Sequence, residues 1–319
     1  MSQIFLTQAP ARGRVLARFE YPDLRVERGY ANRTLHVDLS ANTIEARPVS
    51  EIMKETFIGG RGFGLKLLWD AVTPETTWDD PENAIVISSG PLGGTMQFPG
   101  SGKSIVVTLA PATGVPIDSN VGGHFGPILK FSGWDALEVK GQAERDVIVA
   151  VEGNDRVVTV EEAPEGPSDS YVVAEQLHAM FARDEADRQY VSTVSAGPGA
   201  EHTWMGCLNF SYWDWRRKSI RLKQAGRGGT GTVFRHKKIK ALVVRKSGWR
   251  PKWTIVSALP SAAEAEEAPL PAKAPLPPVS EEPPAKKEPD KKKPSEKKTA
   301  RKKPAIKRPA KKKTAKKKK

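Results

Sequence analysis

The stretch SNVGGHFGPILKFSGWDALEVKG, residues 119–141, carries the most informative pattern in this chain. Its first eight residues include Asn120 and the three glycines Gly122, Gly123 and Gly126. Because glycine has no Cβ, the backbone of such a loop can approach a ligand closely. A tight turn between two strands is the alternative interpretation, since one glycine-rich loop is a weak signal by itself.

The remainder of this stretch predicts local structure. Residues 128–131 indicate a short buried segment, Ser132 and Gly133 a turn, and residues 136–139 a strand. The glycine-rich loop is also not alone in the chain. Further glycine clusters are GGRGFG (59–64), GPLGGT (90–95), GPG (197–199) and AGRGGTG (225–231).

Taken together, five segments resemble the N-terminal domain of the tungsten-pterin aldehyde ferredoxin oxidoreductases. They occur in that family's order over about residues 30–247. The resemblance implies an α+β fold, a β-sheet-rich two-layer domain. The segments are GGRGFGLKLLWD (59–70), PENAIVISSGPLGGT (81–95), TGVPIDSNVGGHFGPILKFSGWDALEVKG (113–141), SAGPGAEH (195–202) and AGRGGTGTVFRHKKIKALVV (225–244).

The same resemblance implies a cofactor, a tungsten or molybdenum pterin held by exposed backbone amides and fixed cations. Lys103 and Lys223 stand where the family typically has arginine, which keeps the charge but removes the bidentate fork. Turn and packing roles are the alternative for all of these positions. The implied cofactor-binding residues are Lys103, Asn120, Gly122, Gly123, Lys223, Ala225, Gly226 and Arg227.

Complete members of this family continue into helical domains that supply four cysteines for a [4Fe-4S] cluster. This sequence has one cysteine, Cys207, and such a cluster needs four thiolates. The implied activity, interconversion of an aldehyde and a carboxylic acid with electrons passed to iron–sulfur centres, therefore requires a Cys-rich partner chain and ferredoxin. Cys207 itself is expected to be a small buried apolar residue.

No catalytic acid or base is identified by the sequence. The five histidines show no spacing typical of metal ligands, and only His124 lies in the cofactor-like loop. Residues 204–223 interleave aromatic and basic side chains. We expect a structural or interface loop there, with single-stranded nucleic-acid or phosphate recognition as the alternative.

Composition divides the chain into an N-terminal extension (1–30), a pterin-cofactor-binding-like domain (31–247), a Pro/Ala/Glu linker (248–284) and a disordered Lys/Pro/Ala-rich tail (285–319). The tail holds 17 Lys and 2 Arg against 3 acidic residues, whereas the whole chain carries a net charge of +14. Residues 1–284 are therefore near neutral. No signal peptide or apolar run of membrane-spanning length is found, so a cytoplasmic protein without a membrane span is expected.

The tail suggests a function of a second class. A disordered polycation binds nucleic acid or polyphosphate without sequence specificity, through the release of counterions. A non-catalytic protein that binds polyanions is thus the alternative to the enzyme, and a solubilising extension is the simpler interpretation of the tail. The candidate polyanion-binding residues are Lys291, Lys292, Lys293, Lys311, Lys312 and Lys313.

Periodicity predicts several further elements. Residues 35–44 favour a β-hairpin, and Ser50 favours the start of a short helix followed by a second helix after the GGRGFG loop. A helix beginning near Asp169 is expected to carry an apolar stripe. Further predicted strands are 84–88, 104–109, 146–151, 156–160, 190–194 and 239–244.

Overall fold

The computed structural model describes residues 10–23, 25–95, 100–166 and 169–248. All of these residues lie in one unit, Met1–Leu259. The candidate polyanion-binding lysines lie outside the described residues, as does the whole of the tail.

Two mixed β-sheets form the framework. Both are mainly antiparallel, with one parallel pair in each, β2 with β7 and β8 with β13. In order across the first sheet, the strands are β3 (Thr43–Pro48), β2 (Arg33–Asp38), β7 (Ala136–Lys140), β4 (Ile85–Ser88), β5 (Ser104–Leu109) and β6 (Pro116–Val121). In order across the second, they are β1 (Val15–Glu20), β9 (Val157–Glu162), β8 (Val147–Glu152), β13 (Ile239–Arg245), β10 (Val191–Ser195), β11 (Leu208–Asp214) and β12 (Ser219–Ala225).

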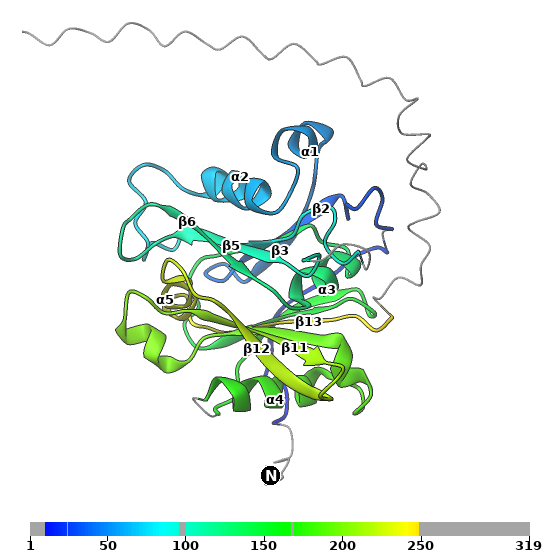
Figure 1. The fold of residues 1–319 in the computed structure, drawn as a ribbon. Coiled ribbons are helices and arrows are strands. Elements are labelled where there is room, and N and C mark those ends of the chain that lie inside the picture. The colour runs from blue at the N-terminus through cyan, green and yellow to red at the C-terminus, as the bar shows by residue number, and fades with distance from the viewer. Residues whose placement is uncertain (1–9, 24, 96–99, 167–168, 249–319) are drawn as a thin grey trace, which may run out of the picture. The chain divides into compact units, whose positions relative to one another are not determined.

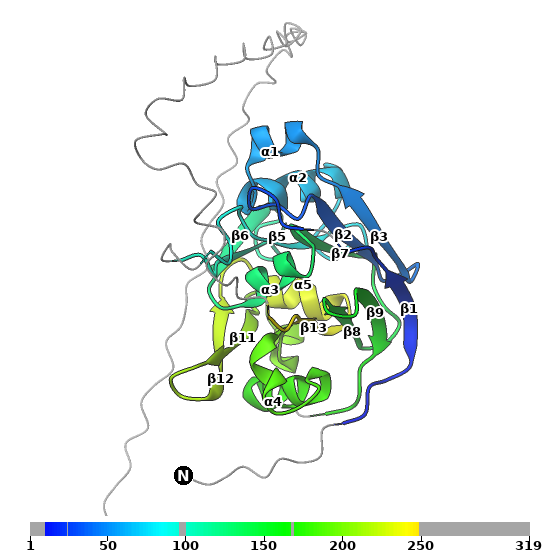
Figure 2. The ribbon, with the colours of Figure 1, turned by 90° about the vertical axis from the view of Figure 1, so that its right-hand side faces the viewer.

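The helices cover both sheets and fill part of the space between them. Figure 1 shows α1 and α2 above the six-stranded sheet and α4 below the seven-stranded sheet, and Figure 2 shows α3 and α5 between the two. None of the helices in the described part of the chain is long and apolar enough to cross a membrane. Their bounds are α1 (Glu51–Phe57), α2 (Arg61–Ala71), α3 (Phe125–Phe131), α4 (Ser170–Phe181) and α5 (Thr230–His236), with 3-10 turns η1 (Asp187–Tyr190) and η2 (Pro198–His202).

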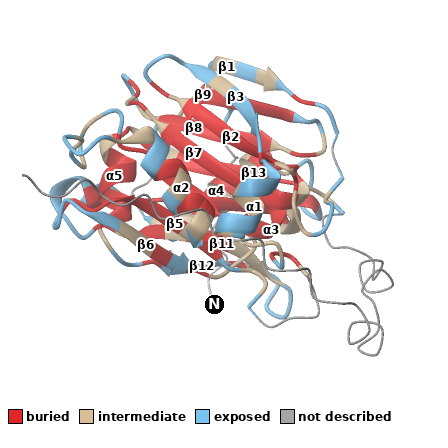
Figure 3. Ribbon diagram, turned by 90° about the horizontal axis from the view of Figure 1, so that it is seen from above, coloured by how far each residue is buried: buried red, intermediate tan, exposed pale blue. Residues whose placement is uncertain are grey.

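Central strands are apolar on both faces because both faces are covered. On β8, Val147, Val149 and Val151 enter the core between the sheets, while Ile148 and Ala150 pack against α4. This alternation follows from the two-residue period of a strand. Figure 3 shows the result as buried central strands, with exposed residues on α1 and along β1 and β3. The two-layer α+β prediction is confirmed.

Most predicted elements occur close to their expected bounds. The hairpin is β2–β3, and Ser50 caps α1, where its hydroxyl accepts a hydrogen bond from the Met53 amide. Asp169 caps α4 through the amides of Tyr171 and Val172. Residues 15–20, for which the sequence predicted no element, form β1 and pair with β9 at the edge of the seven-stranded sheet.

Two loop predictions are wrong. The expected GGRGFG loop is a loop only at Gly59 and Gly60, because α2 begins at Arg61. Gly64 lies where α2 packs on β5, and a Cβ there would come within 2.5 Å of the Val107 side chain. Residues 204–223 do not form a loop either, since most of them belong to the paired strands β11 and β12.

Candidate functional site

The two sheets approach one another at their edge strands. β6 is the last strand of the six-stranded sheet, β12 is the last strand of the seven-stranded sheet, and the two are in contact. Every residue predicted to bind the cofactor lies on or beside these two strands. We call this region the β6–β12 edge and define it as Lys103, residues 118–123 and residues 223–227.

The predicted residues come from three segments that are distant in sequence. Lys103 precedes β5, whose first residue pairs with the last residue of β6. Asn120 lies on β6 itself, rather than in the loop that the sequence predicted, and is exposed. Gly126 belongs to α3, so it is a packing position rather than part of that loop. Only the Gly122–Gly123 part of the predicted loop remains.

This short loop lies against β11 and β12. A Cβ at Gly122 would lie 3.3 Å from Cδ of Lys223, and a Cβ at Gly123 would lie 3.8 Å from Cβ of Tyr212. Gly123 has a φ of +125°, which favours glycine. At Gly102 a Cβ would come within 2.4 Å of the carbonyl oxygen of Gly123, so the loop before β5 and the loop after β6 are in close contact.

The residues that follow β12 are tied to β6. The backbone N–H of Arg227 donates a hydrogen bond of 3.1 Å to the hydroxyl oxygen of Ser119. Gly226 is exposed, and a Cβ built on it would meet nothing within 4 Å. Ala225 differs from its neighbours because it is fully buried, 0% exposed, opposite Leu208. Of these positions, Ala225 therefore offers a ligand no side-chain contact.

Three exposed cations gather at the β6–β12 edge. In the described part of the chain, Lys103, Lys223 and Arg227 have no carboxylate within ion-pair distance. The Lys223 ammonium lies 5.8 Å from the centre of the Tyr212 ring. Positive charges that have no ion-pair partner among the described residues, on segments beside the exposed Gly226, form an arrangement suited to an anionic ligand.

Arg61 is a residue that the sequence analysis did not single out. Its guanidinium donates to Asp118 on β6 at 2.8 Å, and the Asn120 side-chain amide donates to the same carboxylate at 3.4 Å. Arg61 thus orients the polar side chains of β6 from the first turn of α2. Its place in the GGRGFG motif was the available signal, but only the fold brings residue 61 next to residue 118.

Two buried lysines lie outside the β6–β12 edge. Lys130 on α3 donates a hydrogen bond to the carbonyl oxygen of Gly90, which fastens the segment preceding residues 91–95 to α3. Burial lowers the pKa of Lys130 to about 8, an effect that the charge of Asp135 opposes only in part. A similar environment lowers the pKa of Lys237 to about 8, where the ammonium donates to the carbonyls of Pro81 and Gly141.

The histidines do not form a site. His178 is buried on α4, and burial lowers its pKa to about 3, so the ring is neutral. Its Nδ1 donates to the Arg188 carbonyl at 3.0 Å, which leaves Nε2 to accept from the Ser211 hydroxyl at 2.8 Å. His124 precedes α3 and packs edge-on against Tyr212 at 5.6 Å between ring centres. No group of three metal-ligating side chains exists among the described residues.

Cys207, expected to be buried, is only partly buried where it precedes β11. The close contact at this residue is made by its backbone rather than by its thiol. A Cβ on Gly231 of α5 would come within 2.3 Å of the Cys207 carbonyl oxygen, so α5 packs closely on this segment.

Comparison with known proteins gives one consistent result. A family model described as "Aldehyde ferredoxin oxidoreductase, N-terminal domain" matches residues 34–246. The tungsten-containing aldehyde ferredoxin oxidoreductase of Pyrococcus horikoshii is 33% identical over 219 residues, which are 68% of this chain and 33% of that protein. The WOR-like subunit of the aliphatic sulfonate oxidoreductase of Pyrococcus furiosus is 28% identical over 234 residues, 70% of this chain and 35% of that protein.

Among solved structures, the active-site complex of benzoyl coenzyme A reductase with 1,5-dienoyl-CoA is similar, with a TM-score of 0.57 and 27% sequence identity. That alignment covers 68% of this chain and 31% of the other. The chain therefore spans about a third of the length of each of these three relatives. The extent of the family match agrees with the five sequence segments, which predicted a resemblance over about residues 30–247.

Proposed function

The chain belongs to the family of aldehyde ferredoxin oxidoreductase N-terminal domains, and from this premise we propose that it is the pterin-binding part of an oxidoreductase. The reaction proposed is the interconversion of an aldehyde and a carboxylic acid, with electrons passed to iron–sulfur centres on another polypeptide. One observation carries the proposal. Three cations that have no ion-pair partner among the described residues lie on segments that the fold brings to the β6–β12 edge beside the exposed Gly226, although they are up to 124 residues apart in sequence.

The residues at this edge fit a tungsten or molybdenum pterin. Its phosphates match the cations Lys103, Lys223 and Arg227, since lysine and arginine both bind phosphate oxygens. Its pterin edges carry hydrogen-bonding groups that match the Asn120 amide and the exposed backbone at Gly226. When bound, such a cofactor supplies two-electron redox chemistry. The residues of this chain bind and orient it, and no acid or base among them is assigned a catalytic role.

Lysine at positions 103 and 223 favours a charge-based contact over a bidentate one. A lysine ammonium is a compact point charge on a flexible stem, whereas an arginine guanidinium presents a planar fork. Lys223 is nonetheless constrained, because its stem passes within 3.3 Å of the position of a Cβ on Gly122. The ring of Tyr212 also lies beneath its ammonium. We propose that this packing replaces the directional preference that an arginine would provide.

An iron–sulfur cluster requires another polypeptide in this proposal. Cys207 is the one thiol among the 319 residues, and a [4Fe-4S] cluster takes four. We therefore propose a Cys-rich partner that carries the cluster and passes electrons to ferredoxin. The β6–β12 edge, which is exposed here, would be covered by that partner once the cofactor is bound.

Gentle purification from the native source, followed by elemental mass spectrometry, tests this proposal. Tungsten or molybdenum at about one atom per chain, with iron only in fractions that contain a Cys-rich polypeptide, is the expected result. Protein that carries neither metal in any fraction, including fractions with intact partners, would reject it. Iron bound to this chain alone would reject the assignment of the cluster to a partner.

We propose separately that the Lys-rich segment 285–319 binds polyanions. The observation behind this second proposal is its content of 17 Lys and 2 Arg against 3 acidic residues. Binding should weaken steeply with salt, since each phosphate contact releases counterions. The full chain should bind a labelled DNA duplex at low ionic strength, and a chain without residues 285–319 should not. Equal binding by the two proteins would refute this role.

A further inference from the structure

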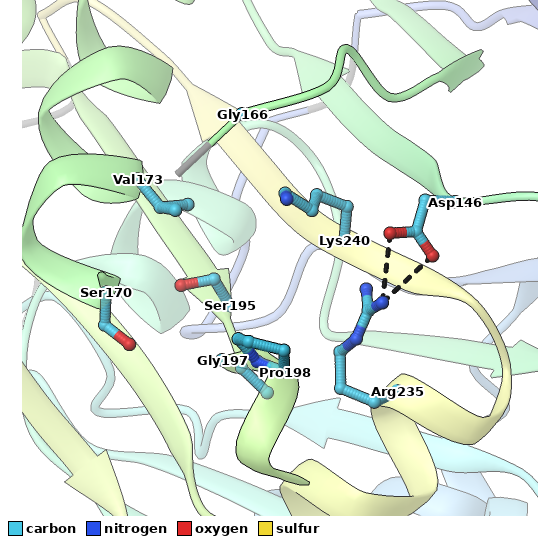
Figure 4. A pocket seen from close by; sticks show the side chains of 10 residues that line it. Asp146, Gly166, Ser170, Val173, Ser195, Gly197, Pro198, Arg235 and Lys240 are labelled. Atoms are coloured by element: carbon cyan, nitrogen blue, oxygen red, sulfur yellow. Dashed lines mark hydrogen bonds and ion pairs between the residues drawn. The ribbon is translucent and has the colours of Figure 1, made fainter. Parts of the chain in front are cut away.

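A polar cavity lies where α4 and the end of α5 meet the seven-stranded sheet. It has a volume of about 300 Å³ and opens between the start of α4, the end of β10 and the end of α5 (Figure 4). We call it the α4 pocket. Its lining residues are Asp146, Gly166, Ser170, Val173, Ser195, Ala196, Gly197, Pro198, Arg235 and Lys240.

A β-bulge directs a lysine into this pocket. Ile239 pairs with Val147 and Ala241 pairs with Ile148, so Lys240 is one extra residue on β13 opposite two consecutive residues of β8. Such bulges re-aim a side chain that the regular ladder would hold elsewhere. Figure 4 shows the Lys240 side chain extending toward Val173 and away from Asp146. Among the described residues, no carboxylate lies within ion-pair distance of Lys240.

The other cation of the pocket is already neutralised. Arg235 donates to both carboxylate oxygens of Asp146 at 3.0 Å and to Glu201 at 2.6 Å. Its remaining Nη1 donates to the carbonyl oxygen of Ile239, which joins α5 to β13 just before the bulge. Arg235 therefore forms a rigid wall of the pocket and holds the bulge in place. The positive charge left for a ligand is that of Lys240.

Two hydroxyl groups add hydrogen-bond donors. Ser195 is only 2% exposed, and its hydroxyl has no partner among the described residues. Figure 4 shows this hydroxyl turned toward Ser170. The Ser170 oxygen accepts a hydrogen bond from the Asn209 amide at 3.1 Å, so its own proton is left for an acceptor. A buried hydroxyl without a partner is costly, which indicates that something else completes it.

The backbone N–H groups of Tyr171 and Val172 at the N-terminus of α4 are not counted as donors to a ligand. The Asp169 carboxylate already accepts from the Tyr171 and Val172 amides at 2.8 and 3.1 Å. A ligand in the pocket would therefore meet one ammonium group and two hydroxyl donors, with Val173, Ala196 and Pro198 as apolar walls.

We propose that the α4 pocket binds a small organic monocarboxylate. Three donors that have no acceptor among the described residues match the two oxygens of one carboxylate, and the apolar walls match a short hydrocarbon part. A phosphate dianion would need a second free cation, but Arg235 is committed to Asp146 and Glu201. The site is independent of the proposed cofactor site, because no residue of the β6–β12 edge lines it.

Isothermal titration calorimetry on the full chain tests the site, with butyrate, benzoate and inorganic phosphate as probes. A carboxylate should bind with a dissociation constant of about 1 mM or lower, and phosphate more weakly. Lys240→Met should weaken carboxylate binding at least about tenfold and Ser195→Ala about threefold, since a charged hydrogen bond contributes more than a neutral one.

The matched control is Lys66→Met, which removes a surface lysine paired with Asp70 on α2. It should leave the affinity unchanged, and a thermal melt should show that all three variants fold. Carboxylate binding that survives Lys240→Met in a folded protein would overturn the proposal. So would the absence of carboxylate binding to the unmodified chain, or tighter binding of phosphate than of either carboxylate.

Discussion

The two edges of the seven-stranded sheet differ in whether their cations form ion pairs. At the β1 edge and the neighbouring strands, arginines are paired: Arg12 with Glu152 and Glu161, and Arg14 with Glu162. At the β12 edge, Lys223 has no such partner among the described residues, and neither does Arg227. The cations near the β1 edge form ion pairs with carboxylates of the same sheet. Cations without carboxylates are available to a ligand, which is why we assign the β6–β12 edge to the cofactor.

Among the paired cations, Arg245 on the central strand β13 provides the largest expected effect. It is 1% exposed and contacts Glu152 at 3.0 Å, Asp155 at 2.8 Å and Asp187 at 3.3 Å. Arg245→Met would leave Asp187 without an ion-pair partner among the described residues, while Glu152 keeps Arg12 and Asp155 keeps Arg183. Because the lost guanidinium is buried, the free energy of unfolding should fall by about 3–5 kcal/mol. Denaturation with guanidinium chloride measures the change.

The matched variant on the unpaired side is Lys223→Met. Lys223 is exposed and has no carboxylate partner among the described residues. The free energy of unfolding of the variant protein should therefore differ from that of the unmodified chain by less than about 0.5 kcal/mol. A loss as large as that of Arg245→Met would mean that the unpaired cation stabilises the fold as the paired one does, and the contrast between paired and unpaired cations would fail.

A pair of glycine variants distinguishes a glycine needed for packing from a glycine that leaves space for a ligand. In Gly102→Ala, the new Cβ would come within 2.4 Å of the Gly123 carbonyl oxygen, so stability should fall by about 1–3 kcal/mol. In Gly226→Ala, the Cβ would meet nothing within 4 Å, so stability should be unchanged while cofactor content falls. Urea denaturation and metal content measure the two effects. Equal destabilisation by both variants would show that Gly226 is a packing residue.

Lys130 gives a smaller, pH-dependent effect, because it is buried with a carbonyl partner rather than paired or exposed. Its pKa is about 8 in the folded chain and near the usual value of about 10.4 when unfolded. Between these values the folded state releases a proton that the unfolded state keeps. Stability should therefore rise with pH in this window, by roughly 1 kcal/mol per pH unit from Lys130. Below about pH 8 this contribution is constant.

Urea denaturation at several pH values from 7 to 10 measures this slope. Lys130→Met should reduce the slope, and the part that remains should come from Lys237, whose pKa is also lowered to about 8. An unchanged slope in Lys130→Met would show that Lys130 does not titrate in this window.

Local patterns predicted much of this fold. Ser50 and Asp169 were recognisable as helix caps, and residues 104–109 as a strand, because short-range chemistry determines these features. β1 and β12 were not predicted, since both are edge strands whose formation depends on a neighbour that the local sequence does not reveal. Edge strands also carry charged residues, and Arg221 and Lys223 made this segment look like part of a basic, aromatic loop although they alternate with Ile220 and Leu222.

The residues of the candidate site could be named from the sequence, but their arrangement in space could not. The resemblance to the family named Asn120 and Lys223, and the fold brings their strands together. The resemblance also named Ala225, although burial removes its side chain from any ligand. The α4 pocket had no signal in the sequence. It depends on the bulge that directs Lys240, and a bulge is a property of paired strands.

Metal content in a pair of triple variants tests the central claim most directly. The edge variant combines Lys103→Met, Lys223→Met and Arg227→Met. The control combines Arg18→Met, Arg47→Met and Lys66→Met. The control removes three surface cations that are paired with Glu20, Glu45 and Asp70, respectively. Both would be expressed in the native source and compared with the unmodified chain by elemental mass spectrometry. We expect the control to keep its tungsten or molybdenum and the edge variant to lose at least about 90% of it at unchanged stability, since three proposed phosphate contacts are removed. Equal metal content in the two folded variants would contradict it.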